Sequence, residues 1–166
     1  MSNIEIITNH GSIQLELYPE KAPETVANFL RYIEDDFFTN TLFHRVIPNF
    51  MIQGGGFDTS FSQKKTLAAI KNEANNGLKN KIGSIAMART GDPHSATSQF
   101  FINSSDNDFL NFSSETPQGW GYCVFGQTIE GAETIDKISA VSTGMRAGHQ
   151  DVPNEEVIIE TVSVLT

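Results

Sequence analysis

The chain has 166 residues, and its 20 acidic and 11 basic side chains give a formal net charge of −9. A chain of this length is about one domain with a single hydrophobic core, so we expect one monomeric domain over residues 1–166. An acidic protein repels phosphate backbones and anionic lipid headgroups, so the charge argues against nucleic-acid and membrane-surface partners.

Cysteine usage and hydropathy indicate a cytoplasmic location. Cys123 is the only cysteine and lies in the apolar run Tyr122–Phe125, so it forms no intramolecular disulfide and we expect a buried, inert thiol. No uninterrupted apolar run exceeds four residues, whereas a membrane helix needs about 18 or more. The start, MSNIEIITNHG, lacks the basic and then apolar pattern of a secretory signal.

The first third of the chain changes its hydrophobic period once. Residues 4–7 and 13–17 alternate with period two around Asn9-His10-Gly11, which predicts a β-hairpin. Val26, Phe29, Leu30 and Ile33 then recur at helical spacing after Pro23. This pattern predicts a helix over about 23–35.

The remainder of the chain consists mostly of short apolar segments separated by turn residues. Because they are too short for helices and rich in Phe, Ile and Val, we interpret them as strands, at 43–47, 50–53, 82–88, 98–103, 122–129 and 156–164. One further helix is expected over Ala132–Val141. Many strands with two helices predict a mainly β protein, an antiparallel barrel whose ends the helices close.

Several familiar catalytic arrangements are missing. The four histidines show no metal-ligand spacing, and Gly54–Gly56 lacks the Lys-Ser/Thr of a phosphate-binding loop. No serine lies in a Gly-x-Ser-x-Gly turn, and Asp35-Asp36 follows a predicted helix end. We therefore expect structural or solvated histidines, a turn or a close backbone approach at the glycines, and neither metal nor cofactor.

The segment 43–55 contains an unusual cation. In a strand, Arg45 shares a face with Phe43 and Ile47. A cation is costly there unless it lines an open groove or meets a partner. An exposed barrel face with a snorkelling arginine explains the pattern equally well, and the composition leaves both interpretations open.

Four blocks in register resemble the signature of the cyclophilins, the cyclophilin-type peptidyl-prolyl cis-trans isomerases. They are FHRVIPNFMIQGG at 43–55, GSIAMARTG at 83–91, SQFFI at 98–102 and VFG at 124–126. The resemblance covers nearly the whole chain, and the connection NDFLNFSSETPQGWGYCVFG is similar to that of the bacterial, cytoplasmic branch.

The resemblance implies a closed, eight-stranded antiparallel β-barrel capped by two α-helices, with an active groove on its outer surface. It also implies an enzyme that accelerates rotation about X-Pro bonds in peptides and in unfolded or folding proteins, without covalent chemistry or cofactor. A proline-recognising peptide-binding module or holdase chaperone is the alternative, because fold does not determine function.

Position by position, Arg45 matches the catalytic arginine of the family. The matching groove and peptide-contact positions are Phe50, Met51, Gln53, Ala88, Arg89, Thr90, Gln99, Phe101, Phe109, Leu110 and Tyr122. Three of them depart from the best-known eukaryotic pattern: Phe109 replaces Trp, Tyr122 replaces His, and Arg89 replaces Asn. Because Phe109 lacks the indole N–H and ring area of Trp, we expect cyclosporin, which the family binds, to bind with weakened affinity.

Overall fold

The computed structural model describes residues 2–166, so Met1, the first residue of the expected domain, lies outside the described part. The predicted hairpin is confirmed as β1 (Ser2–Thr8) and β2 (Gly11–Leu17). The predicted helices are confirmed as α1 (Pro23–Glu34) and α2 (Ala132–Ser139).

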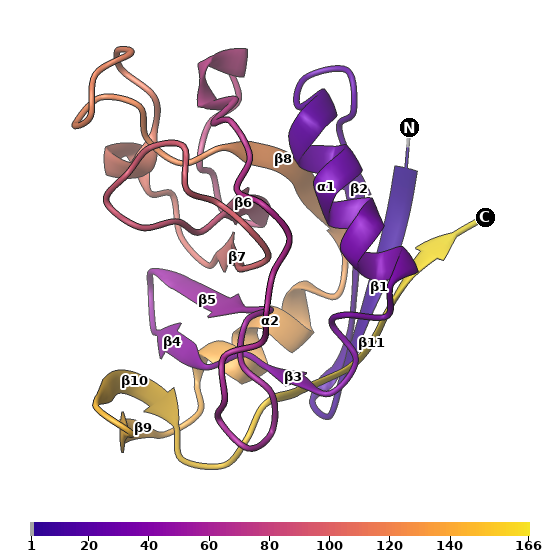
Figure 1. Ribbon diagram of the computed structural model, residues 1–166. Coiled ribbons are helices and arrows are strands. Elements are labelled where there is room, and N and C mark those ends of the chain that lie inside the picture. Colours follow the sequence, from indigo (N-terminus) through magenta and orange to yellow (C-terminus); the bar gives the residue numbers. More distant parts are fainter. Residues whose placement is uncertain (1) are drawn as a thin grey trace.

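An antiparallel sheet of nine strands curls around the core (Figure 1). Its hydrogen-bonded order is β3-β11-β1-β2-β8-β6-β7-β5-β4. The strands not yet introduced are β3 (Thr41–Leu42), β4 (Arg45–Ile47), β5 (Met51–Gly54), β6 (Ser84–Met87), β7 (Phe100–Asn103), β8 (Val124–Glu130) and β11 (Ile158–Leu165). The mainly β antiparallel architecture with two helices is thus confirmed.

The strand count and the closure of the sheet differ from the expectation of a closed, eight-stranded barrel. The nine-stranded order begins at β3 and ends at β4, which only Phe43 and His44 separate in the chain. The sheet is therefore a curl whose two edges are joined by the chain itself. A separate hairpin of β9 (Thr143–Arg146) and β10 (His149–Pro153) was not predicted, because its sequence is mostly polar.

The middle of the sheet is buried on both faces. Ile52, Ile85 and Ile102 point into the main core, where each is fully buried. Their neighbours along β5, β6 and β7 point outward into a second cluster, made of Met51, Ala86, Ala88, Phe101, Leu110 and Val124. Because side chains alternate along a strand, this outer cluster forms the floor of a surface site.

Phenylalanine rings fill the main core beneath α1. The Phe29 ring centroid lies 5.0 Å from that of Phe38, 5.4 Å from that of Phe100 and 5.2 Å from that of Phe125. These rings need no polar partner when buried. The contacts join α1, β7 and β8 around one residue.

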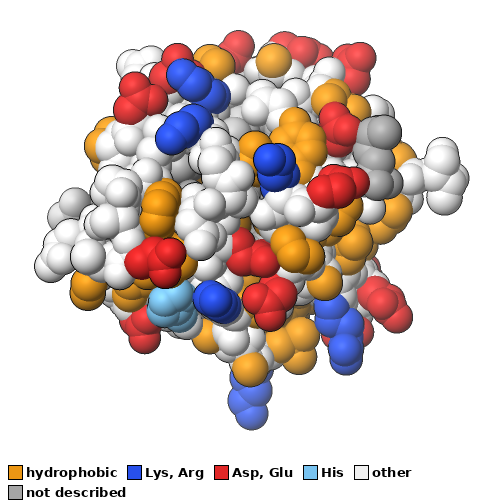
Figure 2. Space-filling model, turned by 90° about the horizontal axis from the view of Figure 1, so that it is seen from above, with side chains coloured by type: hydrophobic (Ala, Val, Ile, Leu, Met, Phe, Trp, Pro, Cys, Tyr) orange, Lys and Arg blue, Asp and Glu red, His pale blue; other side chains and the backbone are white. Residues whose placement is uncertain are grey.

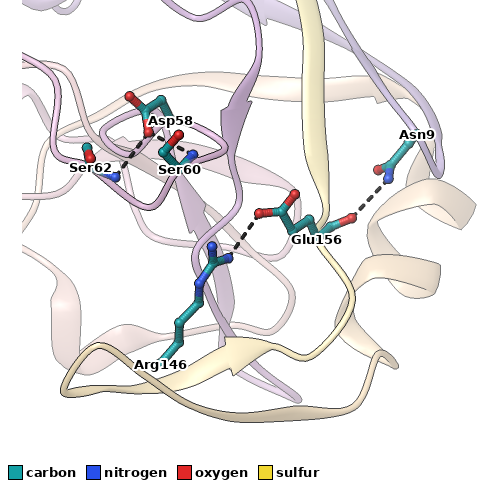
Figure 3. A network of polar contacts seen from close by, with 6 residues as sticks. All are labelled: Asn9, Asp58, Ser60, Ser62, Arg146 and Glu156. Atoms are coloured by element: carbon teal, nitrogen blue, oxygen red, sulfur yellow. Dashed lines mark hydrogen bonds and ion pairs between the residues drawn. The ribbon is translucent and has the colours of Figure 1, made fainter.

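The β9–β10 hairpin packs beside β4 and takes part in a polar network on another side (Figure 3). The Arg146 guanidinium donates to the Glu156 carboxylate at 3.0 Å. The backbone carbonyl of Glu156 in turn accepts a hydrogen bond from the Asn9 side chain at 2.9 Å. These bonds attach the hairpin to the segment before β11 and to the β1–β2 turn.

The loop over residues 57–62 supports the same hairpin. The Asp58 carboxylate accepts the backbone N–H groups of Ser60 and Ser62 at 2.9 and 3.0 Å (Figure 3). The loop presents the Phe61 ring, over which the Arg146 guanidinium lies at 4.7 Å. The hairpin is thus held by an aromatic contact as well as by charge.

Acidic side chains are spread around the face shown in Figure 2, with basic side chains distributed among them. This face therefore carries scattered charges of both signs and no continuous basic patch. Neither helix in the described part of the chain has the length and apolar character needed to span a membrane.

A distant carboxylate caps the N-terminus of α1. The N-cap residue, Ala22, has no side chain that can cap. The Glu73 carboxylate instead accepts from the backbone N–H of Thr25 at 2.8 Å, from its hydroxyl at 2.7 Å and from the backbone N–H of Glu24 at 3.3 Å. A negative charge at this helix end is also favoured by the helix dipole.

We predict that Glu73→Ala lowers the free energy of unfolding by about 1–2 kcal/mol, the usual cost of losing a helix cap. For a chain of this size the melting temperature should fall by about 2–8 °C. Glu34→Ala, which removes an exposed carboxylate at the other end of α1, is the control and should change stability by less than about 0.5 kcal/mol. Equal melting temperatures for both variants would contradict the capping role.

Candidate active site

An open cleft of about 320 Å³ lies on the outer face of the sheet. Ten of the residues singled out in the sequence line it: Arg45, Phe50, Met51, Gln53, Ala88, Arg89, Phe101, Phe109, Leu110 and Tyr122. They come from β4, β5, β7, the end of β6 and the connections before and after them. The fold therefore brings together residues spread over 78 positions of the sequence.

Strand register places the polar end of the cleft. Arg45 pairs with Gln53 across β4 and β5, Gln53 pairs with Phe101 of β7, and Phe101 pairs with Ala86 of β6. Residues paired directly across antiparallel strands point to the same face. One row across four strands thus begins at a cation and ends at a small apolar residue.

The guanidinium of Arg45 is oriented by amides and not by an acid. Its Nη1 donates to Gln53 Oε1 at 3.3 Å, and Gln53 Nε2 donates to Gln99 Oε1 at 2.9 Å. Arg45 is exposed, and within residues 2–166 no carboxylate forms an ion pair with it. The groove interpretation of Arg45 fits this placement, and its positive charge is left unneutralised.

One detail of the sequence interpretation is wrong: Phe43 does not share a face with Arg45. Strand β4 begins at Arg45, and Phe43 is buried in the main core, where its ring contacts Phe100. The chain changes direction between β3 and β4, so strand alternation does not extend back through His44. Ile47 does pack against the outer cluster, as alternation from Arg45 requires.

The glycine triplet makes room for the amide pair. A Cβ on Gly56 would lie 2.5 Å from Cγ and Nε2 of Gln99, and Gly55 has a φ of +88°. A side chain at either position would push Gln99 away or strain the backbone. The triplet is thus a close backbone approach beside the cleft, one of the two structures expected for it.

The other end of the cleft is apolar. Met51 and Phe101 are 2% and 4% exposed and form its floor, and Leu110 closes one side. The Phe109 side chain is 75% exposed, and its ring centroid lies 5.6 Å from that of Phe50. The resulting basin combines a buried apolar floor with an aromatic rim that is open to solvent.

Arg89 joins two segments of the cleft wall. Its guanidinium lies 4.4 Å from the centroid of the Tyr122 ring, donates twice to the Gly121 carbonyl at 2.9 and 3.2 Å, and donates to the Thr90 carbonyl at 2.9 Å. The Tyr122 ring also meets the Phe101 ring edge to face at 5.8 Å. The departures at Arg89 and Tyr122 are therefore coupled, because each residue packs on the other.

A smaller polar pocket of about 150 Å³ adjoins the cleft. It contains the two remaining candidates, Thr90 and Gln99, and shares Gln53, Ala88 and Arg89 with the cleft. Three further lining residues were not singled out in the sequence: Gln63, Ser95 and Thr97. They lie in loops without periodicity, and a run of polar loop residues gives no signal that separates a pocket from a solvated surface.

The lining side chains limit the chemistry of the cleft. Among the described residues that line it there is no histidine, carboxylate, cysteine, serine or lysine. Cys123 is buried next to Thr25, and burial raises the pKa of its thiol to about 11. Among these lining residues only Tyr122 carries a hydroxyl that could act as a nucleophile or general base, whereas the apolar floor beside Arg45 suits the binding of an apolar ring next to a cation.

Comparison with known proteins identifies the class to which this fold and site belong. The family model described as cyclophilin type peptidyl-prolyl cis-trans isomerase/CLD matches residues 3–164. The chain is 62% identical over 157 residues to peptidyl-prolyl cis-trans isomerase B of Escherichia coli K12, with 95% of this chain and 96% of that protein covered. It is 56% identical over 165 residues to isomerase cyp18 of Streptomyces antibioticus, with 99% of each covered.

Solved structures agree with the sequence relatives. A cyclophilin-type isomerase of Cryptosporidium parvum, crystallised in the presence of the dipeptide Ala-Pro, has a TM-score of 0.79 and 29% identity, with 99% of each chain covered. Cyclophilin AquaCyp293 of Hirschia baltica shares the fold with a TM-score of 0.78 at 21% identity, over 97% of this chain and 73% of that one.

The fold and these matches define a peptidyl-prolyl cis-trans isomerase. The chain belongs to the cyclophilin-type isomerase family, and the relatives from Escherichia coli and Streptomyces antibioticus support a bacterial branch.

A buried histidine lies next to the cleft arginine in the chain. His44 is 5% exposed, its ring lies 4.5 Å from the Phe57 ring, and its Nδ1 has no hydrogen-bond partner. Burial lowers the pKa of His44 from 6.5 to about 4, and the nearby His149 and Arg45 act in the same direction. His44 is thus neutral at physiological pH.

We predict that His44 makes stability depend on pH. Between pH 6.5 and pH 4 the unfolded chain binds a proton that the native state does not, so native stability falls as the pH decreases through this range. Urea unfolding at pH 7 and pH 4.5 should show that His44→Phe and His44→Gln each lose about 2–3 kcal/mol less than the wild type. Parallel losses in all three proteins would contradict the prediction.

Proposed function

We propose that the cleft accelerates X-Pro rotation by binding the twisted amide more tightly than either planar isomer, with Arg45 as the donor to the prolyl nitrogen. The observation that carries the proposal is an exposed guanidinium, oriented by Gln53 and free of any carboxylate, at the edge of an apolar basin. Residues 1–166 act in this proposal as one domain.

The reduction of the rotational barrier that catalysis requires is consistent with such a site. Resonance in the peptide bond opposes rotation with a barrier of about 18–20 kcal/mol, and an X-Pro bond isomerises in tens to hundreds of seconds. A rate increase of about 10⁵ requires a barrier lower by about 7 kcal/mol. No covalent bond is broken, so the cleft needs selective binding and not a nucleophile.

Arg45 has the properties that selective binding needs. As the amide twists, the prolyl nitrogen becomes pyramidal and gains a localised lone pair that the planar ground state lacks. A donor aimed at this lone pair stabilises the transition state selectively. A guanidinium keeps its charge at all relevant pH values and presents several N–H groups in a fixed fork, and Gln53 sets the direction of that fork.

The apolar basin grips the proline ring while the acyl side rotates. Met51 and Phe101 offer it a flexible and aromatic floor, and Phe50 and Leu110 offer apolar walls. Ala88, Arg89 and Thr90 contact the peptide backbone, and Gln99 orients Gln53. Tyr122 and Phe109 complete the rim.

The substrates we infer are proline-containing peptides and unfolded or folding proteins. The Ala-Pro dipeptide present with the Cryptosporidium parvum isomerase and the openness of the cleft to extended chains support this substrate class. The single cysteine, with its raised pKa, fits the reducing cytoplasm that we infer as the location. The proposed step requires no cofactor or metal.

We predict that Arg45→Ala lowers kcat/KM at least 10²-fold, or by about 2.7 kcal/mol, as the loss of one transition-state donor commonly does. The measurement is cis-trans exchange of a proline-containing peptide by NMR, with thermal unfolding to show that each variant is folded. Arg31→Ala is the matched control, because Arg31 is an exposed arginine of α1 that pairs with Asp35. Its rates should equal those of the wild type.

The same assay separates catalysis from peptide binding alone. Because the proposed step uses a guanidinium donor and no general acid or base, the wild-type rate should be nearly constant between about pH 6 and pH 8. The role assigned to Arg45 would be refuted if kcat/KM of Arg45→Ala lay within threefold of the wild-type value. A bell-shaped pH–rate profile between about pH 6 and pH 8 would refute it as well. Tight binding with no acceleration by the wild type would instead favour a peptide-binding module or holdase.

We further predict weak inhibition by cyclosporin because Phe109 offers no indole N–H and less ring area than Trp. Phe109→Trp should lower the inhibition constant at least about tenfold, which corresponds to about 1.4 kcal/mol. Inhibition of peptide isomerisation measures the constant, and Phe109→Leu, which removes the ring, should raise it. Nanomolar inhibition of the wild type that Phe109→Trp leaves unchanged would contradict the prediction.

A further inference from the structure

The apolar walls of the cleft come from segments that the sheet does not hold. Phe50 lies in the turn between β4 and β5, Leu110 ends a single 3₁₀ turn (Asp108–Leu110), and Tyr122 lies in the loop before β8. Arg45 and Gln53, by contrast, are inside paired strands. Backbone hydrogen bonds hold these segments in part, from Ser104 N–H to the Phe50 carbonyl at 3.0 Å and from Tyr122 N–H to the Leu110 carbonyl at 2.9 Å. Further hydrogen bonds from buried side chains add to this support.

Three buried asparagines connect these segments. Asn107 Nδ2 donates to the Phe50 carbonyl at 2.8 Å and to Asn103 Oδ1 at 2.7 Å. Asn103 Nδ2 donates to Asn80 Oδ1 at 3.0 Å. Asn80 Nδ2 then donates to the carbonyls of Leu110 at 3.2 Å and Tyr122 at 3.3 Å.

The order of donors and acceptors along this amide chain is determined at its ends. The carbonyls of Phe50, Leu110 and Tyr122 only accept, so Asn107 and Asn80 must both point an NH₂ group outward. Asn103, between them, must then accept from Asn107 and donate to Asn80. A residue that offers only acceptors or only donors cannot replace it without leaving a neighbour unpaired.

Burial makes these hydrogen bonds strong determinants of position. Asn80 and Asn103 are 0% exposed and Asn107 is 3% exposed, and a buried amide that loses a hydrogen-bond partner pays the cost of desolvation. The backbone supports the same link, because Asn107 N–H donates to the Asn80 carbonyl at 2.8 Å. None of the three side chains lines the cleft.

We propose that Asn80, Asn103 and Asn107 are positioning residues, which set the distance between the cleft walls and thereby the affinity for the proline ring. The proposal rests on the proposed function, since it assumes that these walls hold the ring. Loss of these asparagine hydrogen bonds should widen the basin. It should weaken binding of the peptide equally when its X-Pro bond is planar and when it is twisted. Arg45 and Gln53, held by strands, keep their geometry.

The test compares Asn107→Ala, which removes one of the two donors to the Phe50 carbonyl, with Asn80→Ala, which removes a donor to the carbonyls of Leu110 and Tyr122. Each should raise KM for a proline-containing peptide about tenfold and leave kcat within about twofold, the pattern for loss of uniform binding. The control is Thr41→Val, which removes a fully buried hydroxyl donating to the Phe38 carbonyl at 2.7 Å, outside the cleft. It should reduce stability and leave KM unchanged.

Amide NMR spectra give a readout that general destabilisation does not. The amide signal of Met51 should shift in Asn107→Ala, and those of Asn111 and Cys123 in Asn80→Ala, because each shares a peptide unit with a carbonyl that loses a side-chain donor. If a variant does not fold, hydrogen exchange of the side-chain NH₂ groups in the wild-type protein provides the alternative measurement. The NH₂ groups of Asn80 and Asn107 should exchange more slowly than that of exposed Asn154.

The positioning role would be overturned if folded asparagine variants kept the wild-type KM or changed kcat alone. It would also be overturned if Thr41→Val raised KM equally, or if the NH₂ groups of Asn80 and Asn107 were not protected from exchange. A wild-type protein without isomerase activity, or a fully active Arg45→Ala, would instead refute the proposed function. The two failures are therefore distinguishable.

Discussion

Register between β4, β5, β7 and β6 is the constraint on which the site depends. Ile52, Ile85 and Ile102 must point into the main core, so their neighbours must point outward. A slip of one residue in β4 would turn the Arg45 cation inward, where its desolvation is costly, and would expose Val46. The hydrophobic pattern of the core thus also determines that the Arg45 guanidinium points outward, toward the cleft.

The residues of the site are held in place in two ways, by strand pairing and by side-chain hydrogen bonds between irregular segments. The polar end rests on hydrogen-bonded strands, which hold Arg45 and Gln53 in one row. The walls of the apolar end rest on irregular segments, which Arg89 and the three asparagines connect by side-chain hydrogen bonds. Transition-state stabilisation needs a donor that does not move, whereas gripping rings of different peptides tolerates adaptable walls, so this division suits the reaction.

Periodicity predicted the first hairpin and both helices, in which one face is buried, and short apolar runs predicted the central strands, which are buried on both faces. It failed where burial is not periodic: β3 has two residues, β9 and β10 are mostly polar, and Phe43 lies where the chain turns. All twelve candidate residues came from a resemblance or from Arg45 in an apolar strand, and the structure gathers them around two adjoining pockets. Gln63 and the three asparagines were missed because polar residues in loops and at a strand end resemble solvated ones until the fold buries them.

The neutrality of the groups around Arg45 follows from its proposed task. A carboxylate in place of Gln53 would orient the guanidinium equally well, but it would neutralise the charge and occupy two of its donors. Gln53 accepts one hydrogen bond and leaves the rest of the fork available. A protonated His44 would add another cation next to Arg45, and its burial prevents this by lowering its pKa to about 4. Arg45 therefore presents an uncompensated positive charge, which a localised lone pair can approach without displacing a competing anion.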